Sequence, residues 1–106
     1  MSLRHNLTSA HDLMNEKARL FILKELAAQV DGQLNILSLR DLLEIKYGIN
    51  RTREWVQTQL NVMEELGAIS IVPLDAIVVA RIDRSARNHL AQRSVIAGIA
   101  RPFEAE

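Results

Sequence analysis

The chain has 106 residues, enough to bury one hydrophobic core and too few for two. Its 13 Lys and Arg balance 13 Asp and Glu, which excludes a strong overall attraction to nucleic acid or to an anionic membrane, so nucleic-acid binding would need a local basic patch. The absence of cysteine excludes disulfides and thiolate metal sites and favours a cytoplasmic location. No stretch approaches the roughly 18 apolar residues that span a bilayer, so we expect no membrane partner.

The first predicted element is a long amphipathic helix over residues 13–30, preceded by an N-terminal tail of residues 1–12. Apolar residues recur there at steps of three and four, with Glu and Lys between them, as in a helix with one buried face. We expect the helix to stop at Asp31-Gly32, because a glycine just past a helix end adopts the left-handed conformation without steric cost.

A short strand and a second helix follow. Residues 34–37 suit a short edge strand. Ser38 is predicted to cap a helix from about residue 39 to 46, with Asp41 three positions later completing a capping box. That helix is expected to end at Tyr47-Gly48.

The third predicted helix runs to about Leu66, with Asn50 as its N-cap and Thr52 as an alternative start. Trp55 lies on the apolar side of this helix, so its predicted role is to anchor the core. The opposite side is polar. Gly67 closes the helix and marks a sharp change of pattern.

The next two segments are rich in β-branched residues and joined by Pro73-Leu74-Asp75, which favours an antiparallel hairpin of residues 68–72 and 76–82. Asp83 is then predicted to cap a last helix, from residue 84 to about 97, with Gly98 marking its end. The order predicts a mainly α fold with a small β-hairpin. Two helices joined by a tight turn and followed by a hairpin are typical of a winged helix-turn-helix, here with an added C-terminal helix.

Three motifs carry a resemblance to known proteins: Leu39-Arg40-Asp41-Leu42-Leu43, then residues 48–56, then Glu65-Leu66-Gly67-Ala68-Ile69. On these motifs, residues 13–82 resemble the winged-helix domain of small bacterial regulators, including the arsenic-repressor-like group. The whole chain also resembles small winged-helix proteins of tailed prophages. The resemblance implies a winged-helix domain over residues 13–82, and we expect residues 83–106 to form a C-terminal helix and tail that could serve in dimerisation.

By analogy with winged helices that bind DNA, the third helix would enter the major groove of double-stranded DNA and read base edges. The expected contacts from this helix are Arg51, Thr52, Arg53, Gln57, Thr58 and Asn61, with Arg84 and Arg87 of the last segment on the DNA backbone. Arginine can grip guanine through two hydrogen bonds, and glutamine or asparagine can do the same for adenine. The alternative interpretation is that a helix with one buried face simply needs a polar face.

Several features weigh against DNA. The third helix carries Glu54, Glu64 and Glu65, and carboxylates repel phosphates. The Pro73-Leu74-Asp75 turn offers no cation to a DNA backbone. The sequence therefore leaves open a second function, a winged-helix module for protein interaction or assembly that does not bind DNA.

The last segment contains apolar residues beyond those that a small domain needs for its own core. Leu90, Val95, Ile96 and Ile99 are predicted to bind a second copy in a homodimer, and packing back onto the same chain is the alternative. No nucleophile motif, phosphate-binding glycine loop or metal-ligand spacing occurs. We therefore expect no enzymatic activity, cofactor, metal or small-molecule ligand.

Overall fold

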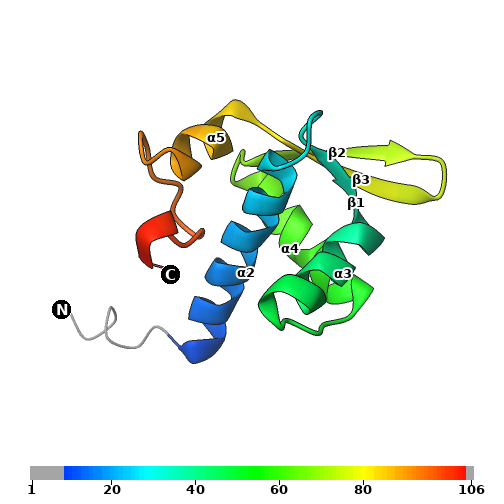
Figure 1. Cartoon of the computed structure of the whole chain (residues 1–106), viewed down its shortest axis with the longest axis horizontal. Coiled ribbons are helices and arrows are strands. Elements are labelled where there is room, and N and C mark those ends of the chain that lie inside the picture. Colours follow the sequence, from blue (N-terminus) through cyan, green and yellow to red (C-terminus); the bar gives the residue numbers. More distant parts are fainter. Residues whose placement is uncertain (1–8, 105–106) are drawn as a thin grey trace.

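A computed structural model describes residues 9–104 (Figure 1). Its elements in chain order are α2 (Ala10–Ala27), β1 (Gln33–Asn35), α3 (Ile36–Tyr47), α4 (Arg53–Glu65), β2 (Ile69–Leu74), β3 (Ile77–Ile82), α5 (Arg84–Leu90) and a 3-10 turn, η1 (Pro102–Glu104). The predicted class, mainly α with a small β component, is confirmed. Within residues 9–104 no helix combines the length and the apolar character that crossing a bilayer requires.

Helix α2 begins three residues earlier than predicted. Ser9 is its N-cap, and the Ser9 hydroxyl accepts a hydrogen bond from the Asp12 N–H at 3.0 Å, which satisfies an amide that the helix itself leaves unpaired. Residues 10–12 therefore belong to the helix, and residues 1–8 of the predicted tail lie outside the described part of the chain. The helix ends at Ala27 and not at Val30.

Helix α3 also begins three residues earlier than predicted, because Asn35 and not Ser38 is its N-cap. The Asn35 side chain accepts a hydrogen bond from the Ser38 N–H at 2.8 Å. Asparagine and serine are both good N-caps. Because the helix begins after Asn35, it includes Ile36, which is buried in the core. For α4 the alternative start is confirmed, since Thr52 caps the helix and accepts from the Trp55 N–H at 3.1 Å.

The sheet has the strand order β1-β3-β2 and is antiparallel throughout. Leu74 pairs with Ile77, so the hairpin loop is Asp75-Ala76. The predicted Pro73-Leu74-Asp75 turn is therefore wrong, because Pro73 and Leu74 are part of β2. Proline fits there since β2 is an edge strand, where a missing N–H breaks no ladder bond. In Figure 1 the hairpin extends well beyond the helices.

One core joins the helices to the inner face of the sheet. α2 lies centrally in Figure 1 and contacts α3, α4, α5 and the sheet. The largest buried apolar side chains come from three helices and β2: Leu20, Ile22, Leu23, Leu26, Ile36, Leu39, Leu43, Val56, Leu60, Met63 and Ile69. Burying each such side chain stabilises the fold by about 1.5–3 kcal/mol before the entropy cost of ordering it.

Helix α5 is much shorter than predicted and ends at Leu90, not near Ala97. Gln92 takes a left-handed conformation with φ 61°, and the Arg93 N–H donates to the Asn88 carbonyl at 2.9 Å, which is the Schellman arrangement that closes a helix. Buried His89 then holds the returning chain. Its Nδ1 accepts from the Ile96 N–H at 3.0 Å, so in the neutral ring Nε2 carries the hydrogen and donates to the Ala100 carbonyl at 2.9 Å.

The left-handed conformation of Gln92 leads to a stability prediction. Glycine adopts this conformation without a Cβ clash, so Gln92→Gly is expected to raise the free energy of unfolding by about 0.5–1 kcal/mol. Urea denaturation measures it. The same substitution inside α4, Gln57→Gly, should instead destabilise by about 1 kcal/mol. If Gln92→Gly destabilises as Gln57→Gly does, the helix does not end at Leu90.

Candidate nucleic-acid interface

The polar face of α4 is exposed because the opposite face lies in the core. Val56, Leu60 and Met63 are fully buried. Of the six predicted contact residues on and before this helix, Arg51, Thr52, Arg53, Thr58 and Asn61 are exposed and Gln57 is half-buried. The structure therefore brings all six to one surface, at the start of α4 and along its first three turns.

Local hydrogen bonds hold several of these side chains on the helix surface. The Gln57 amide nitrogen donates to the Asn61 side-chain oxygen at 3.1 Å, and the Thr58 hydroxyl donates to the Glu54 carbonyl at 3.1 Å. Asn61 keeps its amide nitrogen and Gln57 keeps its oxygen for an external partner. Together these two groups present one donor and one acceptor, as bidentate recognition of adenine requires.

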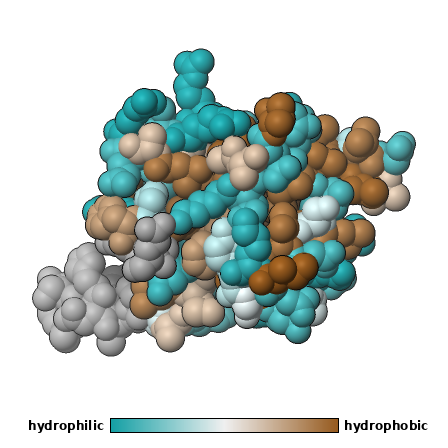
Figure 2. All heavy atoms as spheres, in the orientation of Figure 1, coloured by the Kyte–Doolittle hydropathy of each residue, from teal (hydrophilic) through white to brown (hydrophobic). Residues whose placement is uncertain are grey.

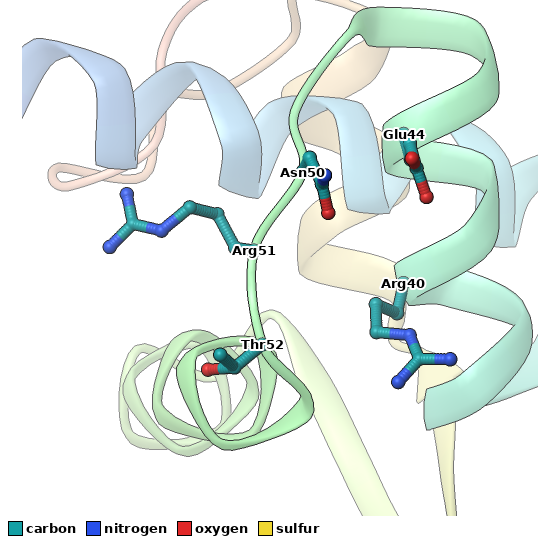
Figure 3. Close-up of a pocket in the computed structure, with 5 residues that line it drawn as sticks. All are labelled: Arg40, Glu44, Asn50, Arg51 and Thr52. Atoms are coloured by element: carbon teal, nitrogen blue, oxygen red, sulfur yellow. The ribbon is translucent and has the colours of Figure 1, made fainter.

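An open groove of about 380 Å³ lies between α3 and the start of α4, lined by Arg40, Glu44, Asn50, Arg51 and Thr52. Figure 3 shows Arg40 and Glu44 on α3, while Arg51 extends from the loop on the side away from them. The Arg40 guanidinium lies 3.6 Å from the Asp41 carboxylate, and both are well exposed, so this ion pair contributes little to stability. From the sequence, Arg40 was identified only as part of a motif, and its place in this groove was not predicted.

Trp55 packs against the core with part of its ring, as predicted, and is half-buried. The Arg51 guanidinium lies 4.5 Å from the centre of the ring, within the range of a cation–π contact. This contact holds the guanidinium beside the first turn of α4.

Glu64 has a structural role in addition to its negative charge. Its carboxylate accepts a hydrogen bond from the Ile71 N–H of edge strand β2 at 2.9 Å. Glu64 is exposed on α4, as are Glu54 and Glu65, so all three acidic residues of this helix remain at its surface.

The other predicted backbone contacts lie elsewhere. Arg84 and Arg87 are on α5, which Figure 1 places at the upper left, whereas the loop before α4 is at the lower right. The Arg87 guanidinium lies against Gly32 in the turn after α2. The approach is so close that a Cβ atom at this position would be only 2.9 Å from Nη2 of Arg87. Both arginines are exposed, but the structure does not bring them to the α4 surface.

Most of the residues predicted to form a dimer interface pack against their own chain. Ile99 is 3% exposed and lies in the core, and Leu90 and Ile96 pack against it. Only Val95 of the four is largely exposed. Leu90, Ile96 and Ile99 pack back onto their own chain, which is the alternative that the sequence left open.

Arg19 of α2 ties α4 to the C-terminal segment. Its Nε donates to the side-chain oxygen of Gln59 at 2.9 Å, and its Nη1 donates to the Gly98 carbonyl at 2.8 Å. Gln59 is 2% exposed, so its oxygen depends on Arg19 for a partner. This bridge fixes the position of the helix that carries the candidate site.

A second polar cluster joins α2 to α3. Buried Glu25 accepts from the Tyr47 hydroxyl at 2.6 Å and from the Lys46 ammonium at 3.0 Å. The Tyr47 ring stacks on Phe21 with ring centres 4.1 Å apart. Burial, and then the hydrogen bond to Glu25 and its negative charge, raise the pKa of Tyr47 far above the usual value for a tyrosine.

This raised pKa predicts a loss of stability at alkaline pH. The folded state favours the neutral phenol, so the contribution is fully present below a pKa of about 10, the unfolded value, and is lost as the pH rises above it. Tyr47 is the only tyrosine, so phenolate absorption reports on it alone. We expect it to ionise at higher pH in the folded protein than in urea, and Glu25→Gln to lower the folded value. Equal ionisation in both states would contradict this.

Among residues 9–104, no group of three or more His, Asp or Glu side chains is arranged to hold a metal ion. No protein-family model, curated protein or solved structure matches the chain.

Proposed function

We propose that this protein is a small winged-helix DNA-binding protein that acts in the cytoplasm as a transcriptional regulator of phage or prophage type. The observation that carries the proposal is the start of α4, where Arg51, Thr52 and Arg53 are exposed at the end of a helix whose other side is in the core. The element order also supports it, because two helices joined by a short loop, α3 and α4, are followed by the β2–β3 hairpin, which is the order expected of a winged helix-turn-helix. The regulatory role and the phage setting come from the sequence resemblance.

In this proposal the first turns of α4 enter the major groove of double-stranded DNA. Arg51 and Arg53 bind guanine edges or flanking phosphates, and Gln57 with Asn61 binds adenine, each good paired contact contributing about 1–3 kcal/mol of discrimination. Arg51 would leave the Trp55 ring to do so, which costs about 0.5–1 kcal/mol at an exposed site. Arg40, across the groove, contacts the backbone.

A titration with mixed genomic DNA fragments at increasing salt tests this proposal. Each neutralised phosphate releases counterions, so the affinity should fall steeply as salt rises. Absence of binding at about 50 mM salt, where the backbone contribution is strong, would reject the DNA-binding function.

A second function, a protein-interaction or assembly module that never binds DNA, is favoured by the hairpin. Residues 70–80 contain no Lys or Arg, whereas Leu74 and Ile77 at the hairpin end are 60% and 43% exposed. A wing that contacts DNA backbone would normally supply cations. Failure of the DNA titration would leave this module as the function that the surface supports.

A further inference from the structure

The outer face of the hairpin carries four apolar side chains, of which Leu74 and Ile77 are exposed and Val72 and Val79 are half-buried. Along β2 and β3 side chains alternate between faces. Ile69, Ala80 and Ile82 are buried on the inner face, so the pairs Val72–Val79 and Leu74–Ile77 share the outer face. Figure 2 shows hydrophobic atoms at the projecting end of the hairpin. We call the four residues Val72, Leu74, Ile77 and Val79 the outer patch.

The edge of β2 is closed to addition of another strand. The Ile71 N–H points off this edge, since it donates to Glu64 at 2.9 Å. Backbone N–H groups two residues apart point the same way, so Pro73 lies on the same edge and has no hydrogen to donate. Proline and an engaged amide protect an edge strand against strand pairing. A partner must therefore meet the outer patch face to face.

The charges around the outer patch match a second copy of the chain. Asp75 lies at the hairpin tip, and exposed Arg81 lies at the other end of the patch, paired with Ser70. The Asp83 carboxylate also lies at this end, where it accepts a hydrogen bond from the Ser70 hydroxyl at 3.1 Å and keeps its negative charge. Asp75 and Arg81 thus lie at opposite ends of one apolar face, with Asp83 near Arg81.

We propose that two copies of this protein associate through their outer patches about a two-fold axis. The two-fold axis lies between the Leu74–Ile77 pair and the Val72–Val79 pair. It places the Leu74–Ile77 pair of each copy against the Val72–Val79 pair of the other copy. The same rotation brings Asp75 of each copy toward Arg81 of the other, because Asp75 directly follows Leu74 at one end of the patch and Arg81 lies two residues after Val79 at the other end. A two-fold interface requires this self-complementarity. The association does not depend on DNA binding.

The size of the patch sets the strength of the association. With strands about 4.8 Å apart and about 3.3 Å per residue, the face of the six paired positions of β2 and β3 covers roughly 190 Å² per copy, well below the ~800 Å² per partner of a stable complex. We therefore expect a dissociation constant of about 0.1–1 mM.

Sedimentation velocity of the full chain from about 20 µM to about 1 mM tests the proposal. The average mass should rise with concentration, and Leu74→Lys should abolish the rise. Ile45→Lys is the matched control, since Ile45 is 78% exposed on α3, and it should leave the association unchanged. An unmodified chain that remains monomeric throughout, or equal effects of both variants, overturns the proposal.

A charge exchange tests the two-fold geometry. Asp75→Arg and Arg81→Asp should each weaken self-association at least about 10-fold through like-charge contacts. In a one-to-one mixture, a dimer of the two different variants has oppositely charged residues at both contacts between positions 75 and 81. The mixture should therefore associate within about 3-fold of the unmodified protein. Asp41→Arg mixed with Arg93→Asp makes the same net-charge changes away from the hairpin and should show no gain over its components. If the mixture of Asp75→Arg and Arg81→Asp associates no better than either variant alone, the proposed two-fold arrangement is wrong.

Discussion

Replacing Arg51 and Arg53 together with alanine is expected to weaken binding to double-stranded DNA by about 100-fold at low salt. Both side chains are exposed at the start of α4, and each arginine contact to a base or phosphate contributes about 1–3 kcal/mol. The dependence of log affinity on log salt should also become shallower by about 2, because each lost phosphate contact removes about 0.9. A fluorescence anisotropy titration at several salt concentrations measures both quantities.

The matched control is the double variant Arg84→Ala with Arg87→Ala. It removes the same two charges from α5, which lies away from the start of α4 (Figure 1). Its affinity should fall by less than about 5-fold, as expected for a change in overall charge alone. Equal losses for the two double variants would mean that binding follows net charge and that α4 does not recognise DNA.

The second prediction concerns Arg19, which links α2, α4 and the C-terminal segment. Arg19→Met keeps the aliphatic part of the side chain and removes both hydrogen bonds, to Gln59 and to the Gly98 carbonyl. We expect the free energy of unfolding to fall by about 2–3 kcal/mol, because the buried Gln59 oxygen loses its charged partner. The midpoint of urea denaturation should fall with an unchanged slope.

A double-mutant cycle separates the bridge from simple loss of packing. Gln59→Leu alone should also destabilise, since it removes one end of the bridge. The double variant Arg19→Met with Gln59→Leu should be more stable than the sum of the two losses predicts, by about 1 kcal/mol, because no buried oxygen remains unpaired. Strict additivity would show that the two side chains do not act together.

The sequence predicted the order of elements and the fold class because the signals for them are local. The helical spacing of apolar residues and the change to β-branched residues after Gly67 depend on neighbours along the chain. Thr52 was recognised as an alternative cap for the same reason. These features required no knowledge of distant contacts.

The incorrect boundaries arise where two local signals compete or where a distant contact decides. Asn35 and Ser38 are both good caps, and the burial of Ile36 favours the earlier one. The pattern of α5 continued past Leu90, but His89 binds the returning backbone at Ile96 and Ala100. That long-range interaction has no signature in the local sequence.

For the candidate site, sequence reasoning identified the polar face of α4 but not its surroundings. Exposure of the residues on α4 followed from helical periodicity, whereas the approach of Arg40 depends on how α3 and α4 pack. The hydrogen bond from the Ile71 amide to the Glu64 carboxylate was also not predicted, because it joins α4 to β2. Spatial proximity between separate elements is the information that one sequence lacks.

The most direct test of the claim that α4 reads DNA is an NMR map of backbone amides during addition of DNA. We predict that the largest shifts occur in residues 50–61, with residues 84–90 of α5 unchanged. The contradicting result is an absence of shifts in residues 50–61 when DNA is bound, or shifts confined to α5. Either outcome would place the DNA contact on another surface.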